Sequence, residues 1–94
     1  MARVHNDEDR HQYSLVEDGE VIGFAAYELD DDVIRFVHTE VDPQYRGGGH
    51  ASMLVEQALD DVRSSGGRTV VPQCSYVRAW IDRHPDYQEL VAED

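Results

Sequence analysis

The chain has 94 residues, which is enough for one domain with a single modest core. Its 20 acidic residues outnumber 8 arginines, lysine is absent, and the formal net charge is −12. A surface this acidic repels the phosphates of nucleic acids and anionic membranes, so we exclude both as partners. The apolar residues make up 40% of the chain and are regularly patterned, which excludes wholesale disorder.

Residues 1–11 are polar and charged, and we expect them to form a disordered leader before a single domain over residues 12–94. The leader lacks the apolar stretch of a signal peptide, and no apolar run is long enough to span a membrane. The one cysteine, Cys74, permits no internal disulfide. These features predict a cytoplasmic protein with a reduced thiol.

Three apolar segments follow the leader and predict an antiparallel meander over residues 12–17, 20–29 and 33–41. Asp18-Gly19 separates the first two segments, and this pair favours a hairpin because both residues tolerate positive φ. A second acidic turn, Asp30 to Asp32, precedes the third segment. That segment, VIRFVHTEV, is apolar on both faces, which predicts a central strand of a sheet against which helices pack.

From Gly48 to Ser64 the apolar residues follow the period of a helix and form one stripe along it. Two glycines after this segment supply a helix end. Residues 68–72 (RTVVP) predict a short strand, and residues 75–83 (SYVRAWIDR) predict a short helix. The order β-β-β-α-β-α therefore predicts a mixed sheet that ends in a parallel βαβ unit.

Three consecutive glycines, Gly47 to Gly49, lie between the third strand and the long helix. One interpretation is a loose turn, since helix starts tolerate glycine. The other is an anion-binding loop, because glycines let backbone N–H groups approach a ligand at the positive end of the helix dipole. The loop matches neither a P-loop nor a dinucleotide-binding fingerprint, and both interpretations stay open on these residues alone.

The segment RGGGHA, residues 46–51, matches the R/Q-x-x-G-x-G/A signature of the GCN5-related N-acetyltransferase superfamily. FVHTEV before it (residues 36–41), and PQCSYV and RHPDY after it (residues 72–77 and 83–87), resemble the very short single-domain members. The resemblance covers nearly the whole chain after the leader. It implies the α/β (α+β) fold of acyl-CoA N-acyltransferases: a mixed sheet with an antiparallel meander, a βαβ unit and a short C-terminal helix.

The same resemblance implies acetyl-CoA as cofactor and an amine as acyl acceptor. The pyrophosphate would lie on backbone N–H groups at the start of the long helix. The pantetheine arm would run between the third strand and RTVVP, which splay apart in this fold. The implied cofactor contacts are Val41, Arg46, Gly47, Gly48, Gly49, His50, Ala51, Ser75 and Arg78. Such short members lack the first helices of a full-sized enzyme, which leaves less wall for an acceptor pocket.

Acyl transfer needs a base for the amine, a donor for the developing oxyanion and stabilisation of the departing thiolate. Histidine is the side chain whose charge changes near neutral pH, so His38 is a candidate base; its alternative is a buried, hydrogen-bonded histidine. In strict alternation His38 shares a face with Ile34, Phe36 and Glu40, although a bulge would change that. Glu40 is a second candidate base, and its alternative is a solvated carboxylate at the strand end.

Cys74 lies between a strand and a helix, where a helix N-terminus lowers thiol pKa values. It is a candidate nucleophile, a candidate acid for the leaving thiolate, or a small buried residue. The five histidines show no spacing typical of a metal site, so we expect no metal.

Two functions of different class fit these patterns. The leading hypothesis is an acetyl-CoA-dependent N-acyltransferase that acts on an amine, and the acidic surface favours a cationic acceptor. The alternative is a non-catalytic acyl-CoA-binding or protein-interaction module with the same fold. We expect a monomer or a weak dimer.

Overall fold

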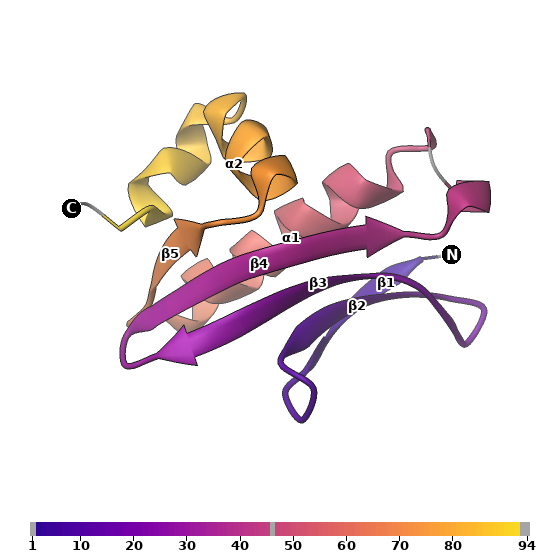
Figure 1. Cartoon of the computed structure of the whole chain (residues 1–94), viewed down its shortest axis with the longest axis horizontal. Helices are drawn as coiled ribbons and strands as arrows, with labels where there is room; N and C mark the ends of the chain where they lie inside the picture. Colours follow the sequence, from indigo (N-terminus) through magenta and orange to yellow (C-terminus); the bar gives the residue numbers. More distant parts are fainter. Residues whose placement is uncertain (1, 46, 93–94) are drawn as a thin grey trace.

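The computed structural model describes residues 2–45 and 47–92. A five-stranded sheet in the order β1-β2-β3-β4-β5 is its framework (Figure 1). The strands are β1 (Arg3–Asp7), β2 (Gln12–Glu17), β3 (Glu20–Asp30), β4 (Val33–Val41) and β5 (Thr69–Pro72). The first four are antiparallel neighbours, and β5 pairs parallel with β4.

Two α-helices and two short 3-10 helices complete the fold: α1 (His50–Ser65), α2 (Ser75–Asp82), η1 (Pro43–Tyr45) and η2 (Pro85–Leu90). The antiparallel meander, the parallel βαβ unit around α1 and the short helix α2 confirm the predicted fold class. The predicted hairpin is also present, since Asp18 and Gly19 have φ values of 51° and 78° between β2 and β3.

Strand β1 corrects the expectation of a disordered leader. Residues Arg3–Asp7 pair with β2, and the Tyr27 hydroxyl donates a 2.7 Å hydrogen bond to Asn6 Oδ1. Val4 packs against the core. The polar composition concealed this strand, because Val4 is the only apolar residue of Arg3–Asp7 and it is only partly buried.

The core lies between one face of the sheet and the two helices. The predicted stripe of α1 is buried there, and its residues are Leu54, Val55, Ala58, Leu59 and Val62. Helix α2 lies on the same face, because its Val77 belongs to the same buried cluster as Val55, Ala25 and Phe36. Each fully buried valine or leucine side chain contributes about 1.5–3 kcal/mol to folding. The helices thereby fix the position of the loops that precede them.

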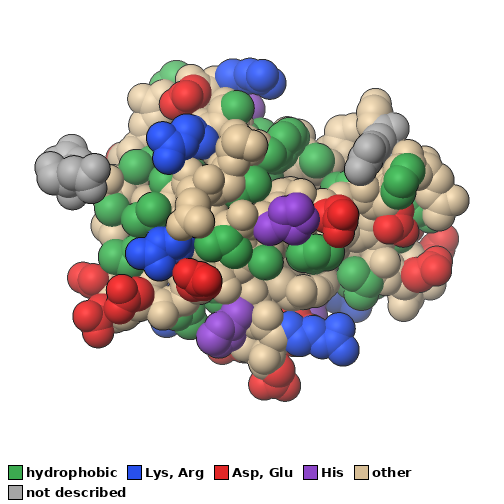
Figure 2. All heavy atoms as spheres, viewed as in Figure 1, with side chains coloured by type: hydrophobic (Ala, Val, Ile, Leu, Met, Phe, Trp, Pro, Cys, Tyr) green, Lys and Arg blue, Asp and Glu red, His purple; other side chains and the backbone are tan. Residues whose placement is uncertain are grey.

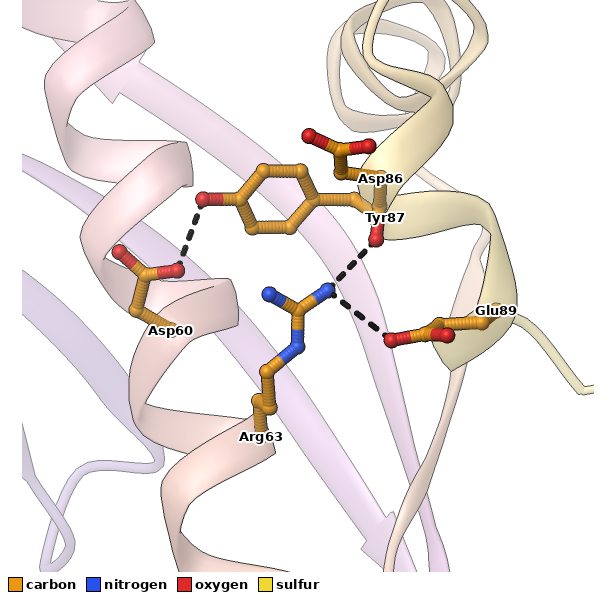
Figure 3. A network of polar contacts seen from close by, with 5 residues as sticks. All are labelled: Asp60, Arg63, Asp86, Tyr87 and Glu89. Carbon is orange, nitrogen blue, oxygen red and sulfur yellow. Dashed lines mark hydrogen bonds and ion pairs between the residues drawn. The ribbon is translucent and has the colours of Figure 1, made fainter.

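Segment η2 is held against the outer side of α1 by the polar contacts in Figure 3. The Tyr87 hydroxyl donates to Asp60 Oδ1 over 2.8 Å. Arg63 donates to the Asp86 carbonyl oxygen over 2.6 Å and forms an ion pair with Glu89 at 3.5 Å. The Arg63 guanidinium also lies 4.8 Å from the centre of the Tyr87 ring. These groups are largely exposed, so we expect each contact to add less than about 1 kcal/mol.

Candidate functional site

A β-bulge in β4 decides which way its side chains point. Ala26 pairs with His38 but Tyr27 pairs with Phe36, so Val37 is an extra residue in β4. An extra residue reverses the alternation of faces beyond it. His38 therefore lies on the face opposite Phe36, which corrects the face assigned by strict alternation.

His38 and Glu40 share the face of the sheet that is turned away from α1, and both are exposed. They lie opposite Ala26 and Phe24 of β3, and directly opposite residues of antiparallel strands point to the same face. The Phe24 and His38 rings are 5.8 Å apart between centroids. Figure 2 views this face and shows histidine and acidic side chains among hydrophobic ones along β4. His38 is thus not a buried structural histidine.

Thr39 points the other way, toward the helices and Cys74. It lies opposite the buried Ala25, and its hydroxyl is 3.5 Å from the Cys74 thiol, with which it shares a hydrogen bond. The Cys74 backbone N–H donates to the Phe36 carbonyl oxygen over 2.8 Å. Sequence reasoning missed Thr39, because without the bulge this threonine would face away from Phe36.

The environment of Cys74 lowers the pKa of its thiol below the ordinary value. Burial alone would raise this pKa, but the hydrogen bond that the thiol shares with the Thr39 hydroxyl and the proximity of the backbone N–H groups of Val77 and Tyr76 outweigh it. The two backbone groups belong to the first turn of α2, whose N-terminus favours a negative charge. Cys74 is therefore a stronger acid than an ordinary cysteine.

Strands β4 and β5 diverge after a short parallel ladder, as the resemblance implied (Figure 1). The ladder ends at Phe36 and Pro72, and the remaining half of β4 runs beside the starts of α1 and α2. Two adjoining hollows of about 370 and 300 Å³ open there and share three lining residues, Val41, Ala51 and Tyr76. We call these two hollows together the cleft.

The two ends of the cleft differ in chemistry. One end is lined by His38, Thr39 and Glu40 of β4. The other end is lined by η1, the glycine loop and the first turn of α1, through Tyr45, Gly47, Gly49, His50 and Ser52. The structure therefore brings the predicted base candidates and the predicted glycine loop to two hollows that share lining residues.

Each glycine of the loop has its own structural reason. Gly47 and Gly49 have φ values of 86° and 80°, a region that strains any residue with a side chain. Gly48 is different, because a Cβ there would lie 3.0 Å from Nδ1 of His50. The triplet is thus a shaped entry to α1 rather than a loose turn.

The start of α1 suits an anionic ligand. The first backbone N–H groups of a helix have no partner within the helix, and the N-cap residue Gly49 has no side chain to cap them. The first turn contains no acidic residue, although the protein is strongly acidic elsewhere. Phosphate groups would therefore fit this end of the cleft. The predicted contact Arg46 lies outside the described residues.

Two further residues shape this end of the cleft, and neither was assigned a role from the sequence. Burial raises the pKa of the Tyr45 hydroxyl, and the carboxylates of Glu17 and Glu20 raise it further. The Ser52 hydroxyl accepts a 2.8 Å hydrogen bond from the Trp80 indole N–H. That bond ties the first turn of α1 to α2.

Ser75 and Arg78, the remaining predicted cofactor contacts, lie in the first half of α2 and are exposed. They are not among the residues that line the two described hollows of the cleft. Their roles stay predictions.

A larger hollow of about 580 Å³ lies between β1, β2 and α1. Its lining includes Glu56, Asp60 and Asp61, whose negative charges oppose an anionic ligand. Among residues 2–45 and 47–92, no group of three or more His, Cys, Asp or Glu side chains could hold a metal ion. Within the same residues, neither helix has the length and apolar character needed to cross a membrane.

Comparisons with known proteins agree with this geometry. Residues 12–90 match the family described as GCN5-related N-acetyl-transferase. The structure is similar to a GCN5-like putative N-acetyltransferase from Staphylococcus aureus, with a TM-score of 0.72 and 16% identity over 98% of this chain and 89% of that chain. The comparison with curated proteins found no match.

Two solved Escherichia coli proteins are also similar. One is the ribosomal-protein-S18-alanine N-acetyltransferase, with a TM-score of 0.65 and 22% identity over 83% of this chain and 54% of that chain. The other is a GNAT family N-acetyltransferase in complex with CoA, with a TM-score of 0.53 and 31% identity over 58% of this chain and 34% of that chain. The chain thus spans about half of the first and a third of the second.

Proposed function

Because this chain belongs to the GCN5-related N-acetyltransferase family, whose cofactor is acetyl-CoA, we propose that it is an acetyl-CoA-dependent N-acyltransferase that acts on an amine. The observation that carries the proposal is the cleft itself. It joins the glycine loop at the start of α1 to His38, Glu40 and Thr39 on the bulged half of β4. A phosphate-binding end and an end with proton-transfer groups are what this reaction requires.

At the phosphate end, the N–H groups at the start of α1 hold the diphosphate of the cofactor. Backbone donors in a fixed loop need no reorganisation when the ligand arrives. Gly47 and Gly49 let the backbone reach the ligand without intervening side chains. Val41, Ala51 and Tyr76, which both hollows share, line the path from this end to β4.

At the other end, His38 takes a proton from the acceptor amine. An amine of the lysine type has a pKa of about 10.4, so it arrives as an ammonium and must lose a proton before it can attack. His38 is exposed and lines the cleft, and Glu40 lies two residues further along the same face of β4. The Glu40 carboxylate attracts the ammonium, while the His38 imidazole accepts its proton.

Cys74 acts as the acid in this proposal. The bound cofactor would supply an acetyl group activated as a thioester. When the amine nitrogen bonds to the acetyl carbon and the carbon–sulfur bond breaks, Cys74 gives its proton to the leaving sulfur. Its lowered pKa makes this donation easier than from an ordinary thiol. The Thr39 hydroxyl and the first turn of α2 then stabilise the Cys74 thiolate until it takes up the second proton that the nitrogen loses as the amide forms.

The charge of the protein supports a cationic acceptor. A net charge of −12 attracts polyamines or basic peptides and speeds their encounter with the cleft. We further propose a cytoplasmic location, because a free thiol at Cys74 suits a reducing compartment.

The second candidate function is a non-catalytic acyl-CoA-binding module. The observation that favours it is coverage, since the chain spans only 54% and 34% of the two Escherichia coli relatives.

A thiol-release assay with acetyl-CoA and a panel of primary amines separates the two functions. We expect turnover with at least one cationic amine, and a fall of about 10²- to 10⁴-fold in kcat for His38→Ala. Cys74→Ala should also lower kcat. The matched control is His5→Ala, which removes an exposed histidine from β1.

CoA binding is measured in parallel by calorimetry. Binding without turnover on any amine would favour the non-catalytic module. Absence of CoA binding by the wild-type chain would refute both functions.

A further inference from the structure

The His50 side chain has an unusual position at the start of α1. Its Nδ1 is buried, yet it has no hydrogen-bond partner in the described part of the chain. The residue lines the cleft at the end formed by the glycine loop. Buried polar atoms in folded proteins are almost always paired, so an unpaired one calls for an explanation.

Two neighbours hold the imidazole in this place. The Tyr45 ring lies edge-on to it, with centroids 5.5 Å apart and an angle of 70° between planes. On the other side the imidazole occupies the space that a side chain of residue 48 would fill, because Nδ1 and Cε1 lie 3.0 and 3.1 Å from an ideal Cβ on Gly48. Nδ1 therefore faces the glycine loop and not bulk solvent.

An unpaired Nδ1 is costly in the ligand-free protein, since the atom has lost water without gaining a partner. The cost disappears when a ligand group supplies the missing hydrogen bond. The glycine loop is where the diphosphate is proposed to bind, and diphosphate oxygens are strong acceptors for an imidazole N–H.

We propose that the His50 imidazole is a ligand-binding group of the cleft and donates a hydrogen bond through Nδ1 to the diphosphate of the bound coenzyme. This assignment rests on the proposed function, and it adds a side chain to a contact otherwise made by backbone N–H groups. It also explains why residue 48 is a glycine, since a larger residue there would displace the imidazole.

Calorimetric titration with CoA tests the assignment on three proteins: wild type, His50→Leu and His50→Asn. The leucine variant keeps apolar packing against Tyr45 but has no donor. The asparagine variant keeps an N–H donor near the position of Nδ1. We expect His50→Leu to bind CoA about tenfold more weakly or worse, and His50→Asn to retain most of the affinity.

Titration with 3′-dephospho-CoA identifies the group that is contacted. This ligand keeps the diphosphate and lacks the ribose phosphate, so the loss caused by His50→Leu should be the same as with CoA. Equal affinity of wild type and His50→Leu for CoA would overturn the assignment and leave the proposed function intact. A loss that vanishes with 3′-dephospho-CoA would overturn the contact with the diphosphate.

A measurement on the wild-type protein tests the same assignment without relying on variants, which could fold poorly. Nitrogen NMR of the His50 imidazole should show a change at Nδ1 when CoA is added, as a new hydrogen bond forms. An unchanged Nδ1 resonance at saturating CoA would overturn the assignment. Absence of CoA binding by the wild type would overturn the proposed function and this assignment together.

Discussion

The Cys74 thiol and the Thr39 hydroxyl lie 3.5 Å apart although they are 35 positions apart in the chain. The contact joins the residue that caps α2 to the bulged half of β4. It exists because the bulge at Val37 turns Thr39 toward the helices. The chemistry proposed for Cys74 therefore depends on the geometry of a different strand.

Thr39→Val should raise the pKa of the Cys74 thiol, because the thiolate loses a hydrogen-bond donor while its burial remains. The pH dependence of Cys74 alkylation by iodoacetamide measures this pKa. Thr39→Ser is the matched control, since it keeps the hydroxyl and should leave the profile close to that of the wild type. An unchanged profile in Thr39→Val would contradict the stabilisation of the thiolate by Thr39.

The same pKa also predicts a dependence of stability on pH. The folded-state pKa of Cys74 lies below its ordinary value of 9.0, so deprotonation favours the folded state. This contribution to the free energy of unfolding is complete above pH 9.0 and is lost as the pH falls through the lowered pKa. Comparison of wild type and Cys74→Ala by chemical denaturation at several pH values measures it.

Gly49→Val should lower the affinity for CoA through the backbone of the loop. A β-branched residue at a φ of 80° is strained, which costs about 1–3 kcal/mol of stability and distorts the start of α1. Gly67→Val is the matched control, because Gly67 has a φ of 78° and equally open space beyond the other end of α1. We expect similar losses in thermal stability, with CoA binding weakened only in Gly49→Val. Normal CoA binding by Gly49→Val would refute the phosphate-binding role of the loop.

Tyr27→Phe should loosen β1 without disturbing the rest of the sheet. The substitution removes the 2.7 Å hydrogen bond to Asn6, which costs about 1 kcal/mol and leaves the amide oxygen without this donor. Hydrogen exchange of β1 amides should therefore accelerate, while amides of β4 keep their protection. Tyr13→Phe serves as comparison, since its hydroxyl donates to Asp61 of α1 instead. Unchanged exchange in β1 would mean that Tyr27 does not hold this strand.

The contact between Tyr87 and Asp60 predicts that the Tyr87 hydroxyl ionises at a higher pH than an ordinary tyrosine. The hydrogen bond to the Asp60 carboxylate, followed by burial, raises the pKa of Tyr87 to about 12. Because the folded-state pKa is raised, the stabilisation is complete below pH 10.0 and is lost as the pH rises toward 12. Asp60→Asn should move one tyrosinate absorbance step to lower pH, and Asp61→Asn should leave that step in place. If the tyrosinate step of Asp60→Asn stays at the wild-type pH, Asp60 does not cause the raised pKa of Tyr87.

Much of the fold could be predicted from local patterns. The stripe from Leu54 to Val62 predicted α1, and Asp18-Gly19 predicted the turn between β2 and β3. Such patterns succeed because side-chain burial repeats with a period of 2 in strands and 3.6 in helices. β1 was not predicted, because a short edge strand with one partly buried apolar residue, Val4, has too little pattern to detect.

Several residues of the candidate site could be named from the sequence, but their arrangement in space could not. His38, Cys74 and the glycine loop were identified from types and motifs, while Thr39, Tyr45 and Ser52 were not. The missed residues are common types whose relevance comes only from what they contact. No local pattern distinguishes a threonine beside a thiol from one in solvent.

The sequence by itself determined the order of strands and α-helices from β2 onward, the family, and the place of the glycine loop before α1, because these depend on residues close together in the chain. The tertiary structure decided which way β4 faces beyond Val37 and what each glycine is for. The pairing of β3 with β4 places the bulge, and one extra residue reverses every later side chain. Likewise, only the folded loop reveals that His50 lies where a side chain on Gly48 would be.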